Sequence, residues 1–122
     1  MYERMGGEPA LRAVVDDFVD RMWDDIMIGF FFQAADKQRV KELEFQHASE
    51  FLGGPHRYAG RPLRQAHAAH PIMGGHFARR LQLLRQVFAA HGVPDDIREA
   101  WLAHNSSLVD QITENALGEC RD

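Results

Sequence analysis

Seven of the 122 residues are histidines, and the spacing of several of them suggests chemistry. Glu44 and His47 are three residues apart, and so are His67 and His70, so on helices the members of each pair would share one face. Carboxylate and imidazole groups placed in this way bind iron or zinc in helical bundles, and a single imidazole can ligate haem iron. These residue types indicate a site for a metal ion or for haem, and their spacing leaves both open.

The residues around these pairs have the apolar spacing of helices, and no strand period is found in the sequence. A first helix is predicted to begin near Pro9 and to end near residues 24–25, because apolar residues recur every three or four positions in between. A second is predicted over residues 37–52, with Asp36 as its N-cap and the glycines at 53–54 as its stop. The second helix carries the first of the two pairs.

The second half of the chain begins with a predicted loop over residues 53–61. Pro62 can then start a short helical turn through His67, and Pro71 must end it. After this turn, a long amphipathic pattern over residues 74–92 predicts a third long helix that stops at a glycine. The turn could present His67 to a cavity between the two halves.

A last helix opens at residues 93–96, with acidic residues at its positive end. The residues predicted to point inward from it are Ile97, Trp101, Leu108 and Ile112. Two helices before the central loop and two after it predict an all-α fold in a two-over-two arrangement. At this length we expect one domain over residues 1–122, with a frayed tail from about residue 114.

Composition narrows the class of protein. The net charge of −4 comes from interspersed acidic and basic residues, so binding to nucleic acid or anionic lipid is not expected. The longest apolar run, at residues 26–32, is too short to span a bilayer, and the first residues lack the order of a signal peptide. Cys120 is the single cysteine and cannot form an internal disulfide. We therefore expect a cytoplasmic monomer or homodimer with no nucleic acid or membrane partner.

A series of short motifs also runs along the chain with characteristic order and spacing. The motifs are Tyr2-Glu3-Arg4-Met5-Gly6-Gly7, Val14-Val15-Asp16-Asp17-Phe18, Phe31-Phe32, Leu52-Gly53-Gly54-Pro55, Tyr58-Ala59-Gly60-Arg61, Leu63-Arg64-Gln65-Ala66-His67, His76-Phe77 and Gly92-Val93-Pro94. Together they resemble a group I truncated haemoglobin, from about Tyr2 to Leu108. The resemblance implies a truncated, two-over-two globin fold around haem b, with His67 as the proximal iron ligand and Phe32 packed on the porphyrin.

In a protein of this family, apolar side chains wall the porphyrin, and cations near its rim pair with the propionates. Arg64, one turn before His67, could reach a propionate, although it could equally be a solvated helix arginine. Several apolar residues are candidates for haem contact, and packing within the protein core would explain each of them equally well. The apolar candidates for haem contact are Phe18, Phe31, Phe32, Ile72 and Phe77, with Val19, Val40 and Leu43 on the distal side.

The distal side departs from the family's pattern. The family usually has a tyrosine directly after the phenylalanine that Phe18 matches, and its hydroxyl holds the bound oxygen, whereas this chain has Val19. On the next distal helix the family often has a glutamine facing the iron, and this chain offers Val40, Leu43 and Glu44 there. A hydroxyl donor is therefore absent, and a carboxylate takes the place of an amide.

Glu44 and His47 are the candidate catalytic residues of this distal side. An ionised carboxylate is costly to bury, so Glu44 would have a raised pKa, ligate the iron or pair with a cation. His47 lies on the same helical side and could be that cation or relay protons. The alternatives are a helix rotated so that Glu44 is solvated, and a His47 that is packed and bonded to backbone.

The favoured function is a haem protein that binds O2, NO or CO and that turns over NO, nitrite or peroxide with electrons from a separate reductase. Without a donor at Val19 it should hold oxygen weakly, which disfavours oxygen storage. A haem-based sensor that binds a partner is one alternative, and whether the protein is an enzyme stays open. The other is a non-haem metal protein that uses Glu44, His47, His67 and His70.

Overall fold

The computed structural model of this chain describes residues 1–59 and 74–108, and every regular element in those ranges is a helix. The elements are, in order, α1 (Gly7–Asp24), the short 3-10 helix η1 (Gly29–Phe32), α2 (Lys37–Leu52), α4 (Gly74–Ala90) and α5 (Asp95–Ser107). The four long helices lie where apolar spacing predicts them, so the all-α prediction is confirmed. The short helix η1 was not predicted, because a run of four residues is too short to show a helical period.

Both predicted ends of α2 are found. The Asp36 carboxylate accepts hydrogen bonds from the backbone N–H groups of Gln38 at 3.0 Å and Arg39 at 3.2 Å, and so caps the first turn. Gly53 ends the helix in the left-handed region at φ 87°, a conformation that favours glycine. These two local signals set the length of the helix that carries Glu44 and His47.

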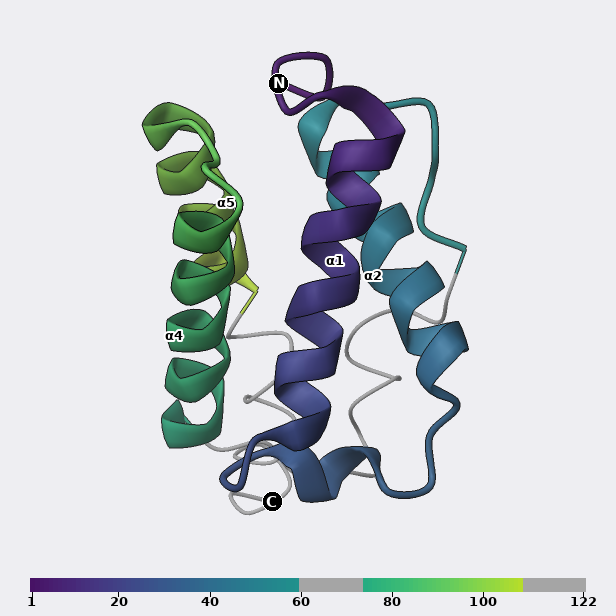
Figure 1. Cartoon of the computed structure of the whole chain (residues 1–122), viewed down its shortest axis with the longest axis vertical. Helices are drawn as coiled ribbons and strands as arrows, with labels where there is room; N and C mark the ends of the chain where they lie inside the picture. The colour runs from purple at the N-terminus through teal and green to yellow at the C-terminus, as the bar shows by residue number, and fades with distance from the viewer. Residues whose placement is uncertain (60–73, 109–122) are drawn as a thin grey trace, which may run out of the picture.

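The helix α1 lies at the centre of the fold, with α2 on one side and α4 on the other (Figure 1). Because α5 packs on α4, the helices form the two pairs of the predicted two-over-two arrangement. Ile97, Trp101 and Leu108 are buried, as predicted for the last helix. The largest fully buried side chains come from all four long helices and are Leu11, Val19, Met22, Phe45, Ser49, Leu84, Val87, Phe88 and Ile97.

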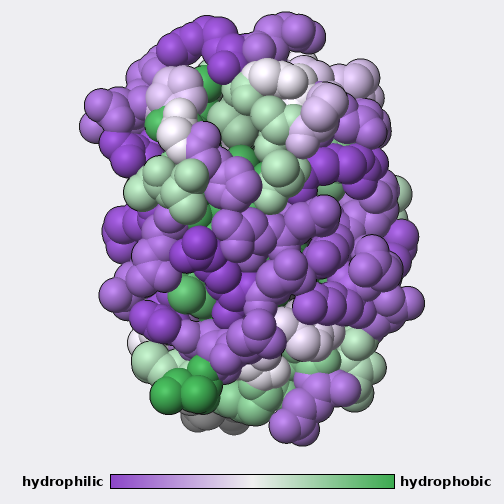
Figure 2. Space-filling view, viewed as in Figure 1, coloured by the Kyte–Doolittle hydropathy of each residue, from purple (hydrophilic) through white to green (hydrophobic). Residues whose placement is uncertain are grey.

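Hydrophilic residues cover the middle of the face shown in Figure 2, and hydrophobic residues gather near its lower end. The apolar run at residues 26–32, which includes the turn between α1 and η1, is divided between core and surface. Ile28 is buried, whereas Ile26 is 97% exposed. In the described ranges, no helix has both the length and the apolar character needed to cross a membrane.

Some predictions concern residues 60–73 and 109–122, which lie outside the described part of the chain. The helical turn through His67 falls in the first of these segments, and Ile112 falls in the second. The single domain over residues 1–122 and its frayed tail therefore stay predictions.

Candidate functional site

Glu44 contacts an arginine from another helix. Its Oε1 accepts a hydrogen bond from Nη1 of Arg80 at 3.0 Å, and its Oε2 accepts one from Nη2 at 3.1 Å. Both side chains are mostly buried, with 25% of Glu44 and 20% of Arg80 exposed. Such a bidentate pair stabilises the ionised form of the carboxylate. Of the three options predicted for Glu44, this contact supports pairing with a cation, and the cation is Arg80 rather than His47.

Asn105 of α5 holds the same guanidinium. Its Oδ1 accepts hydrogen bonds from Nη2 of Arg80 at 3.1 Å and from Nε at 3.4 Å. Its Nδ2 donates to the backbone carbonyl of Trp101 at 3.1 Å, and only 3% of Asn105 is exposed. Because the amide nitrogen is used by that carbonyl, the amide oxygen must face Arg80. We call Arg80, Glu44 and Asn105 the inner network.

The inner network also reaches α1. The guanidinium carbon of Arg80 is 4.9 Å from the centroid of the Phe18 ring, within the range of a cation–π contact. Its Nη1 is 3.6 Å from the sulfur of Met22. Arg80 on α4 therefore touches side chains from α1, α2 and α5. The four long helices converge on this one guanidinium.

Sequence reasoning missed Arg80 and Asn105, although a signal was present for both. Arg80 is three residues after Phe77 and four before Leu84, which are both buried, so it shares their helical face. Asn105 is four residues after the buried Trp101 and is itself buried. A polar residue on an otherwise apolar helical face is the feature that could have identified each.

His47 lies in a cluster of aromatic rings between α2 and α5. Its ring stacks on His104 with centroids 5.5 Å apart and meets Tyr58 edge-on at 5.4 Å, while Phe51 stacks on His104 at 4.1 Å. Burial lowers the pKa of His47 below its usual 6.5, although the nearby Glu44 carboxylate opposes the shift. Burial also lowers the pKa of His104. Both imidazoles are therefore neutral near pH 7, which leaves the charge of Glu44 to be balanced by the guanidinium.

The predicted apolar contacts divide between the core and its border. Phe18, Val19 and Phe77 are buried, with 3%, 0% and 4% exposed. Val40 and Leu43 are half-buried on α2. Phe18 and Val19 belong to the packed core, and the two residues on α2 lie at its border, where another group could cover them.

The two phenylalanines of η1 also lie at the border of the core. Phe32, predicted to pack on a porphyrin, stacks on Trp23 with centroids 4.8 Å apart. Phe31 meets the His76 ring edge-on at 5.0 Å. Both are half-buried, so each keeps part of its ring surface outside the core.

The remaining predicted site residues are Arg64, His67, His70 and Ile72, and all four lie outside the described residues. The proximal assignment of His67 therefore stays a prediction. Within residues 1–59 and 74–108, no three His, Cys, Asp or Glu side chains are grouped so that they could hold a metal ion. The Arg80 contact also engages both oxygens of Glu44, which disfavours this carboxylate as a metal ligand.

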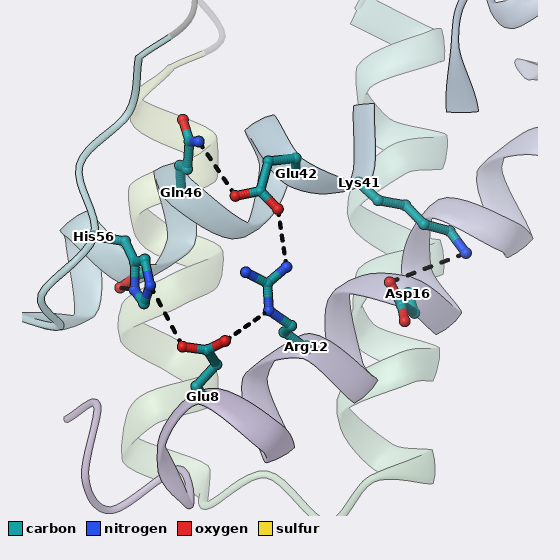
Figure 3. Close-up of polar contacts among 8 residues, drawn as sticks. Glu8, Arg12, Asp16, Lys41, Glu42, Gln46 and His56 are labelled. Carbon is teal, nitrogen blue, oxygen red and sulfur yellow. Dashed lines mark hydrogen bonds and ion pairs between the residues drawn. The ribbon is translucent and has the colours of Figure 1, made fainter. Parts of the chain in front are cut away.

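A second polar network lies between α1, α2 and the loop after α2 (Figure 3). Arg12 donates to Glu8 at 3.0 Å and to Glu42 at 2.9 Å, and we call these three residues the outer network. His56 of the loop joins it, with Nε2 3.4 Å from Oε1 of Glu8. The opposite nitrogen of His56, Nδ1, is 3.4 Å from the hydroxyl of Ser49. The loop is thus tied to both α1 and α2.

Ser49, His56 and Glu8 follow the order of a hydrolytic triad, yet the arrangement does not suit catalysis. Ser49 is 0% exposed, so its hydroxyl cannot reach a substrate. Instead the loop gains further anchors, since Ala59 N–H donates to Gln46 at 2.9 Å. The loop is held in this way up to residue 59, the last one described before the segment that contains His67.

Comparisons with known proteins agree with this architecture. Residues 1–114 match the model of the family described as bacterial-like globin. A group 1 truncated hemoglobin of Mycolicibacterium paratuberculosis is 31% identical over 119 residues, which cover 98% of this chain and 88% of the relative. Another from Synechocystis sp. is 34% identical over 103 residues, covering 80% and 82%.

Solved structures of the same kind share the fold. A point mutant of the truncated hemoglobin from Tetrahymena pyriformis superposes with a TM-score of 0.85 at 24% identity, covering 91% of this chain and 95% of that one. The 2/2 hemoglobin from Synechococcus sp., solved with covalently attached heme, has a TM-score of 0.84 at 22% identity, covering 93% and 97%. The helix pairs and the family match lead to one conclusion: the chain belongs to the bacterial-like globin family, as a truncated haemoglobin.

Proposed function

We propose that this protein binds haem b through His67 and that the haem takes a diatomic ligand such as O2, NO or CO. The observation that carries the proposal is the family match over residues 1–114, which includes His67. When bound, haem supplies an iron centre that binds small gases and exchanges electrons. The protein's own contribution is to hold this group and to surround its ligand.

The described residues fit a group of this kind. Half-buried apolar side chains line the border of the core on η1 and α2, and a porphyrin needs apolar walls. The inner network and the neutral His47 lie on α2, α4 and α5 and supply a few polar groups beside those walls. The side chains of this border are Phe31, Phe32, Val40 and Leu43.

An absorption spectrum of the purified protein tests the proposal. We expect a Soret band in both the ferric and the ferrous protein, and its loss in His67→Ala, because the imidazole would be the iron's anchor. His70→Ala is the matched control, since it removes the other histidine of the same segment and should keep the band. A colourless wild-type protein with tightly bound zinc or iron, or a His67→Ala variant that binds haem normally, would contradict the assignment.

The finer proposal is redox chemistry on NO, nitrite or peroxide, with electrons from a separate reductase. Its support is the buried Val19, which offers no hydroxyl at the position where the resemblance puts the tyrosine that holds bound oxygen, so oxygen should leave more quickly than it does beside such a tyrosine. We expect a fast oxygen dissociation rate in stopped-flow experiments and consumption of nitrite by the reduced protein in an anaerobic assay. Slow oxygen release with no nitrite consumption would favour an oxygen carrier.

A further inference from the structure

Among the described residues, one hydrogen-bond donor of Arg80 meets only a weak acceptor. A guanidinium carries five N–H groups. Asn105 accepts from Nε and Nη2, and the Glu44 carboxylate accepts from Nη2 and Nη1. Among the contacts of the described residues, the second hydrogen of Nη1 meets the sulfur of Met22 at 3.6 Å, and a thioether is a weak acceptor. An oxygen or halide at this point would satisfy the donor better.

The guanidinium is held in place independently of Glu44. Asn105 accepts two of its hydrogen bonds and is fixed in turn by the Trp101 carbonyl. The Phe18 ring supports one face of the guanidinium. Removing the Glu44 carboxylate would therefore free two donors without releasing the arginine, which keeps its anchors on α5 and α1.

Charges near the guanidinium are few in the part of the chain that the structure describes. Glu44 is its carboxylate partner, and Arg80 carries a permanent positive charge. His47, which also lies within electrostatic reach of this pair, is neutral near pH 7 because burial lowers its pKa. Within the described residues, the inner network therefore holds the Arg80–Glu44 ion pair in a mostly buried setting, where an added negative charge would interact strongly with Arg80.

We propose that Arg80 is the distal hydrogen-bond donor of this globin and that it favours anionic ligands of the haem over neutral ones, with Glu44 as their competitor. This inference rests on the proposed haem-binding function. Glu44 stands where the resemblance puts a distal glutamine, and Arg80 contacts it directly. Charge-assisted hydrogen bonds are about twice as strong as neutral ones, so a charged donor discriminates by the charge of the ligand.

Fluoride and carbon monoxide are suitable probes, since one is a small anion and the other a small neutral molecule. We would titrate the ferric haem-loaded protein with fluoride and the ferrous protein with carbon monoxide, and follow both by absorbance. Arg80→Met keeps the length of the side chain and removes the charge. It should weaken fluoride binding by about tenfold or more and change carbon monoxide affinity by less than about threefold.

Glu44→Gln tests the competitor, and it decides the question alone if Arg80→Met fails to fold. Glutamine keeps the shape and removes the negative charge, so fluoride affinity should rise by about threefold or more. Arg79→Gln is the matched control, because Arg79 is the adjacent residue on α4 and pairs with Asp25 at 2.6 Å instead. It should leave both affinities within about twofold of the wild type.

The proposal is overturned if Arg80→Met binds haem and keeps wild-type fluoride affinity, if Glu44→Gln does not raise that affinity, or if Arg79→Gln changes it as much as Arg80→Met does. Failure of the proposed function has a different signature, since the wild-type protein would then show no Soret band and no ligand spectrum at all. The two ideas can therefore fail separately.

Discussion

The inner and outer networks use the same chemistry in different surroundings. Each has an arginine that joins its own helix, α1 or α4, to a glutamate on α2, and each guanidinium lies on a phenylalanine ring. Arg12 is 3.8 Å from the Phe45 centroid, and Arg80 is 4.9 Å from that of Phe18. Their burial differs, because 39% of Arg12 is exposed against 20% of Arg80.

This difference in burial changes what each network does. Water and salt screen the outer ion pairs, so they contribute little to stability. The inner pair is costly to form, since both charges leave water, and costly to break, since a lone charge would stay behind. Asn105, 3% exposed, offsets part of that cost by accepting two hydrogen bonds. We therefore expect the inner network to define a site and the outer one to secure a loop.

The largest expected effect comes from breaking the inner pair. Glu44→Ala leaves Arg80 without its carboxylate and should lower the free energy of unfolding by about 3 kcal/mol, in urea titrations of haem-loaded protein. The double variant Glu44→Leu with Arg80→Met removes both charges and should lose less than the single variant. A double variant that is the less stable of the two would contradict the idea of a buried pair whose separate charges are costly.

Close packing around Gly54 should contribute more to the free energy of unfolding than the exposed ion pairs of the outer network do. A Cβ at Gly54 would lie 2.4 Å from the Ser49 hydroxyl and 2.5 Å from the Tyr2 ring. Gly54→Ala should therefore lower the free energy of unfolding by about 2 kcal/mol. Gly75→Ala is the control, because no atom of the described residues would lie within 4 Å of a Cβ there, and it should be neutral or stabilising. Equal losses in the two variants would show that the contact is unimportant.

The pH dependence of stability tests the burial of the two stacked histidines beside the inner network. Burial lowers the pKa of His47 and of His104 below the usual 6.5, so the unfolded chain takes up protons first as the pH falls. Stability should be full above pH 6.5 and decrease as the pH falls through the lowered values. Carboxylates with lowered pKa values, such as Asp17 and Asp25, lose their contribution to stability only below about pH 5, as the unfolded chain takes up protons near 3.8.

Replacing both histidines by phenylalanine should flatten the loss of stability between pH 7 and 5, as followed by thermal unfolding. Phenylalanine keeps the stacked rings and removes the titrating groups. Tyr58→Phe, which keeps the edge-on ring against His47, is the control and should retain the slope. If the double phenylalanine variant loses stability between pH 7 and 5 as steeply as the wild type, the two histidines are not the cause of that loss.

The smallest expected effect is that of Arg12→Gln in the outer network. Because Arg12, Glu8 and Glu42 are each more than a third exposed, the variant should lose only about 0.5 kcal/mol of unfolding free energy. In about 0.5 M sodium chloride the loss should become smaller, since salt screens exposed pairs. A loss as large as that of Glu44→Ala would mean that burial does not separate the two networks.

Helix positions and ends were determined by short stretches of sequence. Asp36 reaches N–H groups two and three residues ahead, and Gly53 supplies a backbone conformation at its own position, so neither depends on the rest of the fold. The apolar spacing likewise depends on the helical period alone. The order of motifs added the globin family, which the match over residues 1–114 confirmed.

The partners within the site depended on tertiary structure. Glu44 and Arg80 are 36 residues apart, and Arg80 and Asn105 are 25 apart, so their contacts depend on how α2, α4 and α5 are rotated and packed. The sequence showed that Glu44 would need a cation if it were buried, and it offered His47 as the nearest one. Only the packing of the helices placed Arg80 beside Glu44. Arg80 rather than His47 balances the carboxylate, because burial lowers the pKa of the His47 imidazole whereas a guanidinium keeps its charge.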